Sequence, residues 1–167
     1  MINLATLNQL SREAFVNAIG WVFEHSPWVA EQAWAQRPWS SPLALYQSLV
    51  AVVQAAPREA QLALIRAHPD LGSKARMAPA SAQEQQGAGL DALSPEEYAD
   101  LLALNQRYRE RFGFPFILAV RGKGKAEVFQ ALRDRLHNDL EAEFHTALEQ
   151  IYQIARFRLA DILQEAI

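Results

Sequence analysis

Residues 114–120 read Phe114-Pro115-Phe116-Ile117-Leu118-Ala119-Val120, and this is the only run in the sequence with the character of a β-strand. A single apolar run cannot form a sheet, because a strand needs neighbours for its main-chain hydrogen bonds. The rest of the sequence carries the signals of helices. We therefore predict an all-α fold, with residues 1–167 forming one compact domain of about seven to nine helices. Within it, 114–120 is expected to be an extended, buried segment.

The helix ends are predicted from serine and proline positions. Ser41-Pro42 and Ser94-Pro95 each place a capping serine before a proline in the first turn. His68-Pro69 ends the preceding helix, because the residue before a proline avoids the α region, and residues 69–80 are expected to be irregular. The apolar spacing between these signals predicts helices at about 12–23, 27–36, 42–56, 57–67, 81–86, 95–112, 125–137 and 139–165.

Composition excludes several classes of function. The formal net charge of −3 gives no basic footprint for nucleic acid. The absence of cysteine excludes disulfides, thiolate metal sites and a cysteine nucleophile. No apolar run is long enough to span a membrane, and the N-terminal residues lack the pattern of a signal peptide. We therefore expect no nucleic-acid or membrane partner and a cytoplasmic location.

One of the four histidines, His68, has an unusual setting. It lies at a predicted helix end, is held by Pro69, and is followed by the irregular stretch 69–80. A histidine at such a junction can be fixed in orientation and still be reached by a substrate. Because imidazole titrates near neutral pH, His68 is the candidate for acid–base catalysis. The alternative is a structural histidine, which is the commoner role of this residue type.

Glu84 has two interpretations from the sequence. Ser81-Ala82-Gln83-Glu84 has the pattern of a capping box, in which the glutamate side chain returns to the serine amide. Alternatively, Glu84 is a catalytic carboxylate in the first turn of a short helix, where exposed amides favour anions. The pattern alone leaves both interpretations open.

The last helix contains an arginine at an apolar position. An apolar stripe is formed by Leu148, Ile151, Ile154, Ala155, Leu159 and Ile162. Arg158 lies about 20° from Ile151 around the helix axis, in the middle of that stripe. The same geometry places Arg156 about 140° away from Ile151, on the polar side, where it is expected to be solvated. A buried guanidinium needs an acidic partner or an anionic ligand. Arg158 is therefore predicted to point inward, in a structural ion pair or toward a ligand, unless it snorkels at the helix end.

Two further patterns support alternative functions. His137, Glu141, His145 and Glu149 recur every four residues, as in a metal-dependent hydrolase. That spacing drifts about 40° per step around a helix, which favours a solvated face over a metal site. The four tryptophans all lie in the first quarter of the chain, where they are expected to pack helices together. Their alternative role is the partner surface of a non-catalytic, helical protein-binding module.

Six short motifs follow one another in order along the chain. They are His68-Pro69-Asp70-Leu71-Gly72, Ser81-x-x-Glu84-Gln85, Ala88-Gly89-Leu90, Asn105-x-x-Tyr108, Phe112-Gly113-Phe114-Pro115-Phe116-Ile117 and Ile154-Ala155-x-x-Arg158-Leu159. Each motif is short, but in this order and in a chain of this length they are specific. The sequence resembles the family of 2-oxo-4-hydroxy-4-carboxy-5-ureidoimidazoline (OHCU) decarboxylase, which acts in uric acid degradation.

The resemblance implies an all-α homodimer that decarboxylates OHCU, a small ureide, to (S)-allantoin and carbon dioxide with no metal or organic cofactor. It also suggests functional coupling to urate oxidase and hydroxyisourate hydrolase. By the resemblance, His68 and Glu84 match the catalytic positions. The positions that match substrate-contacting residues are Pro69, Ser81, Gln85, Phe116, Ile117, Leu118, Ala119, Val120 and Arg158, the five from Phe116 to Val120 lying on a segment whose main chain meets the substrate.

Overall fold

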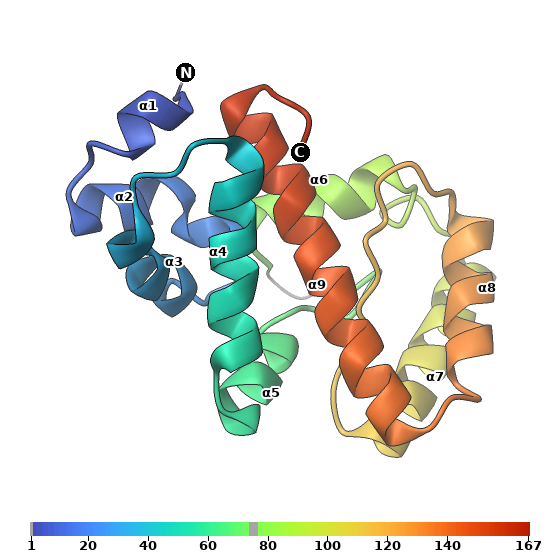
Figure 1. Cartoon of the computed structure of the whole chain (residues 1–167). Helices are drawn as coiled ribbons and strands as arrows, with labels where there is room; N and C mark the ends of the chain where they lie inside the picture. The colour runs from blue at the N-terminus through green and yellow to red at the C-terminus, as the bar shows by residue number, and fades with distance from the viewer. Residues whose placement is uncertain (1, 74–76) are drawn as a thin grey trace. The chain divides into compact units, whose positions relative to one another are not determined.

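A computed structural model describes residues 2–73 and 77–167 of the chain (Figure 1). These residues form nine α-helices and two short 3-10 helices and contain no strand, which confirms the all-α prediction. In chain order the helices are α1 (Leu4–Leu7), α2 (Arg12–Ile19), η1 (Gly20–Val22), α3 (Trp28–Ala33), η2 (Trp34–Gln36), α4 (Pro42–Ala55), α5 (Arg58–Arg66), α6 (Pro79–Gly87), α7 (Pro95–Phe112), α8 (Lys125–Arg135) and α9 (Leu140–Leu163).

The predicted caps of α4 and α7 are present. The Ser41 hydroxyl accepts a hydrogen bond from the main-chain N–H of Ala44 at 3.1 Å, and the Ser94 hydroxyl accepts one from Glu97 at 3.1 Å. The Glu97 carboxylate in turn accepts the Ser94 N–H at 2.9 Å, which completes a capping box. That main-chain hydrogen bond is the main reason why the pKa of Glu97 is lowered. At the other end, Gly113 (φ 78°) ends α7 in the left-handed conformation.

Helix α6 begins earlier than predicted. It starts at Pro79, with Ala78 as its N-cap and no side-chain capping bond, so Ser81 is already the third helical residue. The predicted capping box of Ser81 and Glu84 is therefore wrong. The physical reason is Pro79, whose fixed φ suits the first helical position and starts the helix two residues before the serine. Residues 69–73, 77 and 78 are non-helical, and residues 74–76 of the predicted irregular stretch lie outside the described residues.

The chain forms two compact units, of which the first comprises residues 2–67 and 151–167. In this unit α2, α3 and α4 pack together (Figure 1). Their core contains Phe15, which stacks on the Trp39 ring with centroids 5.3 Å apart. The Trp39 indole N–H donates to the Ser48 hydroxyl at 2.9 Å, and the Trp34 indole N–H donates to the Leu10 carbonyl at 3.0 Å. These two tryptophans thus have the packing role predicted for them.

The second unit comprises residues 68–150 and contains α6, α7, α8 and the first part of α9. Helices α7 and α8 lie side by side (Figure 1). From Leu101 to its end, one face of α7 is buried, and it presents Leu101, Leu104, Asn105, Tyr108 and Phe112. The chain then continues through 114–120 without helix or strand. The apolar side chains of this segment are only 1–8% exposed, which confirms the predicted extended, buried segment.

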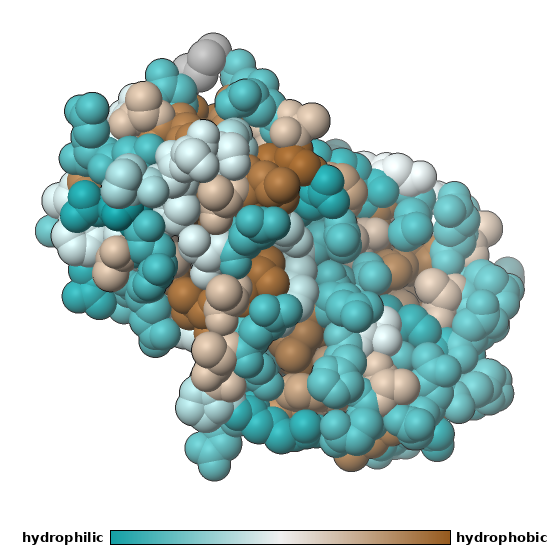
Figure 2. Space-filling view, viewed as in Figure 1, coloured by the Kyte–Doolittle hydropathy of each residue, from teal (hydrophilic) through white to brown (hydrophobic). Residues whose placement is uncertain are grey.

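The surface carries few large apolar side chains. Figure 2 shows hydrophilic residues over most of the face in view, with hydrophobic residues in small patches between them. In the described part of the chain, the exposed large apolar residues are Trp21, Leu43, Leu102 and Leu140. Scattered apolar residues of this kind are normal on protein surfaces. None of the helices in residues 2–73 and 77–167 combines the length and apolar character needed to cross a bilayer.

Candidate active site

The site is built around the loop that begins at His68, which follows the end of α5 and is 7% exposed. Three side chains hold the residues after it. The Arg109 Nε–H donates to both carboxylate oxygens of Asp70, at 2.8 and 3.1 Å. The Asn105 amide donates to the Leu71 carbonyl at 3.0 Å. The Gly72 N–H donates to Gln85 Oε1 at 2.7 Å. The loop that carries His68 is therefore tethered at three successive residues.

Gly72 is required at its position for two reasons. Its φ is +71°, in the left-handed region that side chains other than glycine adopt at a cost. A Cβ atom at Gly72 would also lie 2.3 Å from Cδ2 of Leu101, a buried residue of α7. The Leu101 side chain thus occupies the space that a Cβ at position 72 would need, and it has to shift for any other residue to fit.

Helix α6 contributes the next three predicted residues. Ser81 and Gln85 are one turn apart and buried, and Glu84 lies beside them, partly buried. Gln85 Oε1 is occupied by the Gly72 N–H, and its Nε2 lies 3.6 Å from the Met77 sulfur. Gln85 therefore links α6 to the His68 loop. Its predicted contact with substrate remains a prediction, and any such contact has to use the amide NH₂ or the second lone pair of Oε1.

Helix α7 connects the His68 loop to the extended segment. Asn105 and Arg109 hold the loop, and Tyr108 lies on the buried face of the same helix. The Tyr108 ring packs against Phe114 and Phe116, with centroids 6.0 and 5.3 Å away. One helix thus positions both the predicted catalytic histidine and the predicted substrate-reading main chain.

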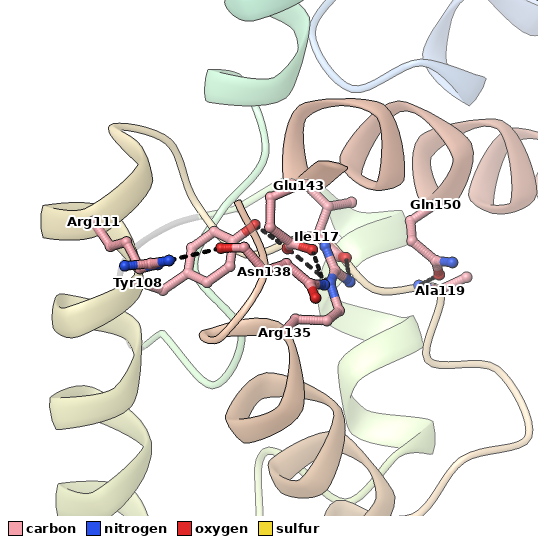
Figure 3. Close-up of polar contacts among 8 residues, drawn as sticks. All are labelled: Tyr108, Arg111, Ile117, Ala119, Arg135, Asn138, Glu143 and Gln150. Carbon is pink, nitrogen blue, oxygen red and sulfur yellow. Dashed lines mark hydrogen bonds and ion pairs between the residues drawn. The ribbon is translucent and has the colours of Figure 1, made fainter. Parts of the chain in front are cut away.

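Polar side chains fix the extended segment at two points (Figure 3). The Arg135 guanidinium donates to the Ile117 carbonyl at 2.6 Å. The Ala119 N–H donates to Gln150 Oε1 at 3.0 Å. Among the described residues, the main-chain N–H groups of Leu118 and Val120 donate to no protein acceptor. Extended main chain offers such groups to a ligand, because a helix does not consume them.

Arg158 lies in the first unit and is 2% exposed, so the prediction that it points inward is confirmed. Its guanidinium donates to Glu24 Oε2 at 3.4 Å and to the carbonyls of Trp21 and Val22 at 3.3 and 3.4 Å. An acidic partner is what a buried guanidinium requires. Its contact with a ligand remains a prediction. Arg156 is only half-buried and donates to the Ile167 carbonyl, so it is less solvated than predicted.

The alternative metal stripe lies on the surface. All four residues are exposed: His137, Glu141, His145 and Glu149. The Nε2 atom of His145 lies 4.0 Å from Oε2 of Glu141. Within residues 2–73 and 77–167, no three histidine or acidic side chains are grouped to hold a metal ion. The prediction of a solvated face is confirmed.

A separate groove of about 800 Å³ lies in the first unit, among α3, α4 and α5. Trp28 and a series of small side chains from these helices line it. None of the predicted catalytic or substrate-contacting residues borders this groove. It therefore adds nothing to the site built around His68.

Sequence reasoning missed a buried carboxylate. Glu143 is 0% exposed and accepts hydrogen bonds from Tyr108, Arg135 and Asn138 (Figure 3). Glu143 lies four and eight residues before the buried Ala147 and Ile151 of the last helix, which places it about 80° from Ile151 around the helix axis. It therefore lies at the edge of the apolar stripe, and the spacing argument that placed Arg158 inward does not predict the burial of Glu143.

Comparison with known proteins shows to which family the chain belongs. Residues 8–160 match the model of the OHCU decarboxylase family. The chain belongs to this family. It is 44% identical to the 2-oxo-4-hydroxy-4-carboxy-5-ureidoimidazoline decarboxylase of Halalkalicoccus jeotgali over 161 residues, which covers 96% of this chain and 92% of that one. The family is one of carboxy-lyases.

Two further relatives are longer than this chain. It is 50% identical to the uric acid degradation bifunctional protein PucL of Bacillus subtilis over 165 residues, covering 99% of this chain and 33% of that protein. The chain thus spans about a third of the length of PucL. The crystal structure of (S)-allantoin synthase superimposes with a TM-score of 0.77 at 30% identity, over 97% of this chain and 54% of that one.

Proposed function

We propose that the protein decarboxylates OHCU to (S)-allantoin and carbon dioxide, with residues 1–167 acting as one OHCU decarboxylase-like domain. The observation that carries this proposal is the loop of His68, which Gln85, Asn105 and Arg109 tether at three successive residues. A buried imidazole on a fixed loop, next to a helix that carries a carboxylate, is an arrangement suited to directed proton transfer. Family membership supplies the substrate.

The proposed reaction needs no covalent bond between the substrate and the protein. The bond between the ring carbon and its carboxylate breaks, carbon dioxide leaves, and the electron pair passes to the adjacent electron-poor C=N unit of the imidazoline ring, whose nitrogen takes up a proton. The hydroxyl on the same ring carbon loses its proton and becomes a carbonyl. A proton then reaches the neighbouring carbon, which carries the ureido group. Because the substrate contains its own electron sink, we propose that no metal or organic cofactor takes part.

His68 and Glu84 divide the proton handling. His68 polarises the substrate hydroxyl and accepts or returns its proton, and Glu84 hydrogen-bonds the substrate and fixes the face that is protonated. The start of α6 at Pro79 supports the role of Glu84, because the carboxylate is not the partner of a capping serine. Delivery of one proton to one face accounts for a single enantiomer of allantoin.

The remaining predicted residues bind the substrate. Arg158 holds an anionic or carbonyl edge through its planar donors, and Pro69, Ser81 and Gln85 contact the substrate beside the His68 loop. Main-chain groups of 116–120 read the ring. The free N–H groups of Leu118 and Val120 support this last role, and Phe116 and its apolar neighbours exclude water from the reacting carbon.

We further propose that the protein is a cytoplasmic homodimer that works in sequence with urate oxidase and hydroxyisourate hydrolase. The name of the B. subtilis relative, a bifunctional protein of uric acid degradation, supports such coupling. Sedimentation of the purified protein tests the dimer directly, and a monomer at all concentrations contradicts it.

The deciding experiment generates OHCU in situ from urate with urate oxidase and hydroxyisourate hydrolase. Because OHCU decays unaided, the readout is the rate and the handedness of allantoin, followed by circular dichroism. We expect (S)-allantoin to form faster in proportion to the amount of protein added. Racemic allantoin at the uncatalysed rate refutes the proposal.

A single substitution locates the chemistry. His68→Asn keeps a side chain of similar polarity, and we expect at least a ~100-fold loss of kcat because general acid–base catalysis contributes that much. Unchanged far-ultraviolet circular dichroism serves as the control for folding. Near-normal turnover by this variant contradicts the assignment of His68.

A further inference from the structure

Glu143 is buried at the centre of a cluster of polar side chains in the second unit (Figure 3). Its Oε1 atom accepts the Tyr108 hydroxyl at 2.5 Å and the Arg135 Nε–H at 2.9 Å, and its Oε2 atom accepts the Asn138 amide at 2.9 Å. Burial and the hydrogen bond to this carboxylate raise the pKa of the Tyr108 hydroxyl well above its ordinary value. Tyr108 therefore remains a neutral donor, and the carboxylate charge faces the Arg135 guanidinium.

The Arg135 guanidinium is fixed from three sides. Its Nε–H donates to Glu143, its Nη1–H donates to the Ile117 carbonyl at 2.6 Å, and its Cζ atom lies over the Phe116 ring, 4.3 Å from the ring centre. Two of these contacts are with the extended segment. A planar group held at both edges and on one face has little freedom to rotate. Arg135 therefore fixes the extended segment relative to Glu143.

Burying the charged groups of this cluster costs free energy. A buried ion pair is often no more stabilising than apolar side chains of the same volume. The Nη2 atom of Arg135 is buried with no hydrogen-bond partner among the described residues, which adds a further cost. Stability alone therefore does not account for this arrangement, whereas a demand for exact placement of main-chain atoms does.

The main-chain groups that are held lie on either side of Leu118. Arg135 holds the carbonyl of Ile117 on one side, and Gln150 holds the N–H of Ala119 on the other. The peptide groups between these two anchors keep their direction, and the free Leu118 N–H is presented there. We propose that Arg135, held by Glu143, is a positioning residue that fixes the main chain of Ile117–Ala119 for binding the substrate ring. This inference rests on the proposed function of the same segment.

The test compares two arginines of α8. Arg135→Lys keeps the positive charge opposite Glu143 but loses the planar fork that reaches both Glu143 and Ile117. The matched control is Arg133→Lys. Arg133 lies in the same turn of α8 and has its own ion pair with Asp100 at 2.8 Å, but it is half-exposed and its ion pair does not involve the extended segment.

Steady-state kinetics on OHCU generated in situ give the first readout. We expect Arg135→Lys to raise KM about tenfold and to leave kcat within about threefold, because ring binding is shared by the ground and transition states. Arg133→Lys should change neither constant by more than about twofold. Equal effects of the two variants, or a loss of kcat without a rise in KM, overturn the proposal.

Amide hydrogen exchange gives the second readout, and it does not depend on activity. We expect the Leu118 and Ala119 amides to exchange faster in Arg135→Lys than in the wild type or in Arg133→Lys, with the core of α4 unchanged. Unchanged exchange at both amides overturns the proposal. One further outcome separates the two proposals. If the Leu118 and Ala119 amides exchange more slowly in the wild type than in Arg135→Lys, but the wild type does not turn over OHCU, the proposed function fails and the anchoring of the segment stands.

If Arg135→Lys does not fold, Tyr108→Phe decides the question. It keeps the aromatic ring and removes only the hydroxyl that donates to Glu143. We expect a rise in KM of about threefold with unchanged kcat, together with faster exchange at Leu118. Wild-type values of both KM and exchange overturn the proposal.

Discussion

The close approach of Gly72 to α7 makes a quantitative prediction for Gly72→Ala. Alanine pays about 1–2 kcal/mol to adopt the left-handed conformation that Gly72 has at φ +71°. The new Cβ also lies 2.3 Å from Leu101 Cδ2, and Leu101 is 1% exposed, so the leucine has no open space to enter. Overpacking of this kind costs about 1–3 kcal/mol. We therefore expect the free energy of unfolding to fall by about 2–5 kcal/mol.

Equilibrium unfolding in urea measures this change, and Gly89→Ala is the matched control. Gly89 has φ +78° but no atom within 4 Å of its added Cβ, so only the conformational cost of about 1–2 kcal/mol applies. Combining Gly72→Ala with Leu101→Ala removes the clash, and we expect the two effects to be less than additive. Equal destabilisation by Gly72→Ala and Gly89→Ala, or full additivity with Leu101→Ala, refutes the steric argument.

Three further predictions concern single side chains. Glu84→Gln should lower kcat about 10–100-fold with an unchanged urea midpoint, because Glu84 has no part in the cap of α6; a normal rate rules out its catalytic role. Arg158→Ala should cost about 3–5 kcal/mol in urea unfolding because it takes the arginine from the buried Glu24, whereas Arg156→Ala should cost less than about 1 kcal/mol; equal costs contradict the assigned burial. The pKa of Tyr108 is raised on folding, so its contribution to stability is present below the unfolded value of about 10 and is lost as the pH rises above it. Tyr108→Phe should reduce the loss of stability between about pH 10 and 11, and an unchanged slope in thermal unfolding contradicts this.

Local signals predicted the starts of helices well where the capping serine and the proline marked the same position. Ser41 and Ser94 each stand directly before a proline, and both cap the helix that follows. At α6 two signals competed, because Pro79 and Ser81 each can mark a start. Proline prevailed, and the serine lies inside the helix. Helix ends are thus predictable from the sequence when neighbouring signals agree.

The candidate site was predictable in its residues but not in its supports. His68 stood out because Pro69 fixes a helix end, which is a local property. The tethers of its loop come from Asn105 and Arg109, more than thirty residues away, and no local pattern pairs them with Leu71 and Asp70. The partnership of Glu143 with Tyr108 spans 35 residues and is likewise set by packing alone. Contacts of this range depend on tertiary structure, which spacing along one helix does not encode.

The free N–H groups of Leu118 and Val120 have a consequence for mutagenesis. Every amino acid except proline carries the same main-chain N–H, so an alanine scan across 116–120 changes the apolar lining and leaves the recognition groups in place. A tolerant scan would therefore be misread as evidence that the segment is passive filler. Only an atom-level change, such as replacing one peptide N–H by an ester oxygen at Leu118, deletes a single donor while retaining the side chain.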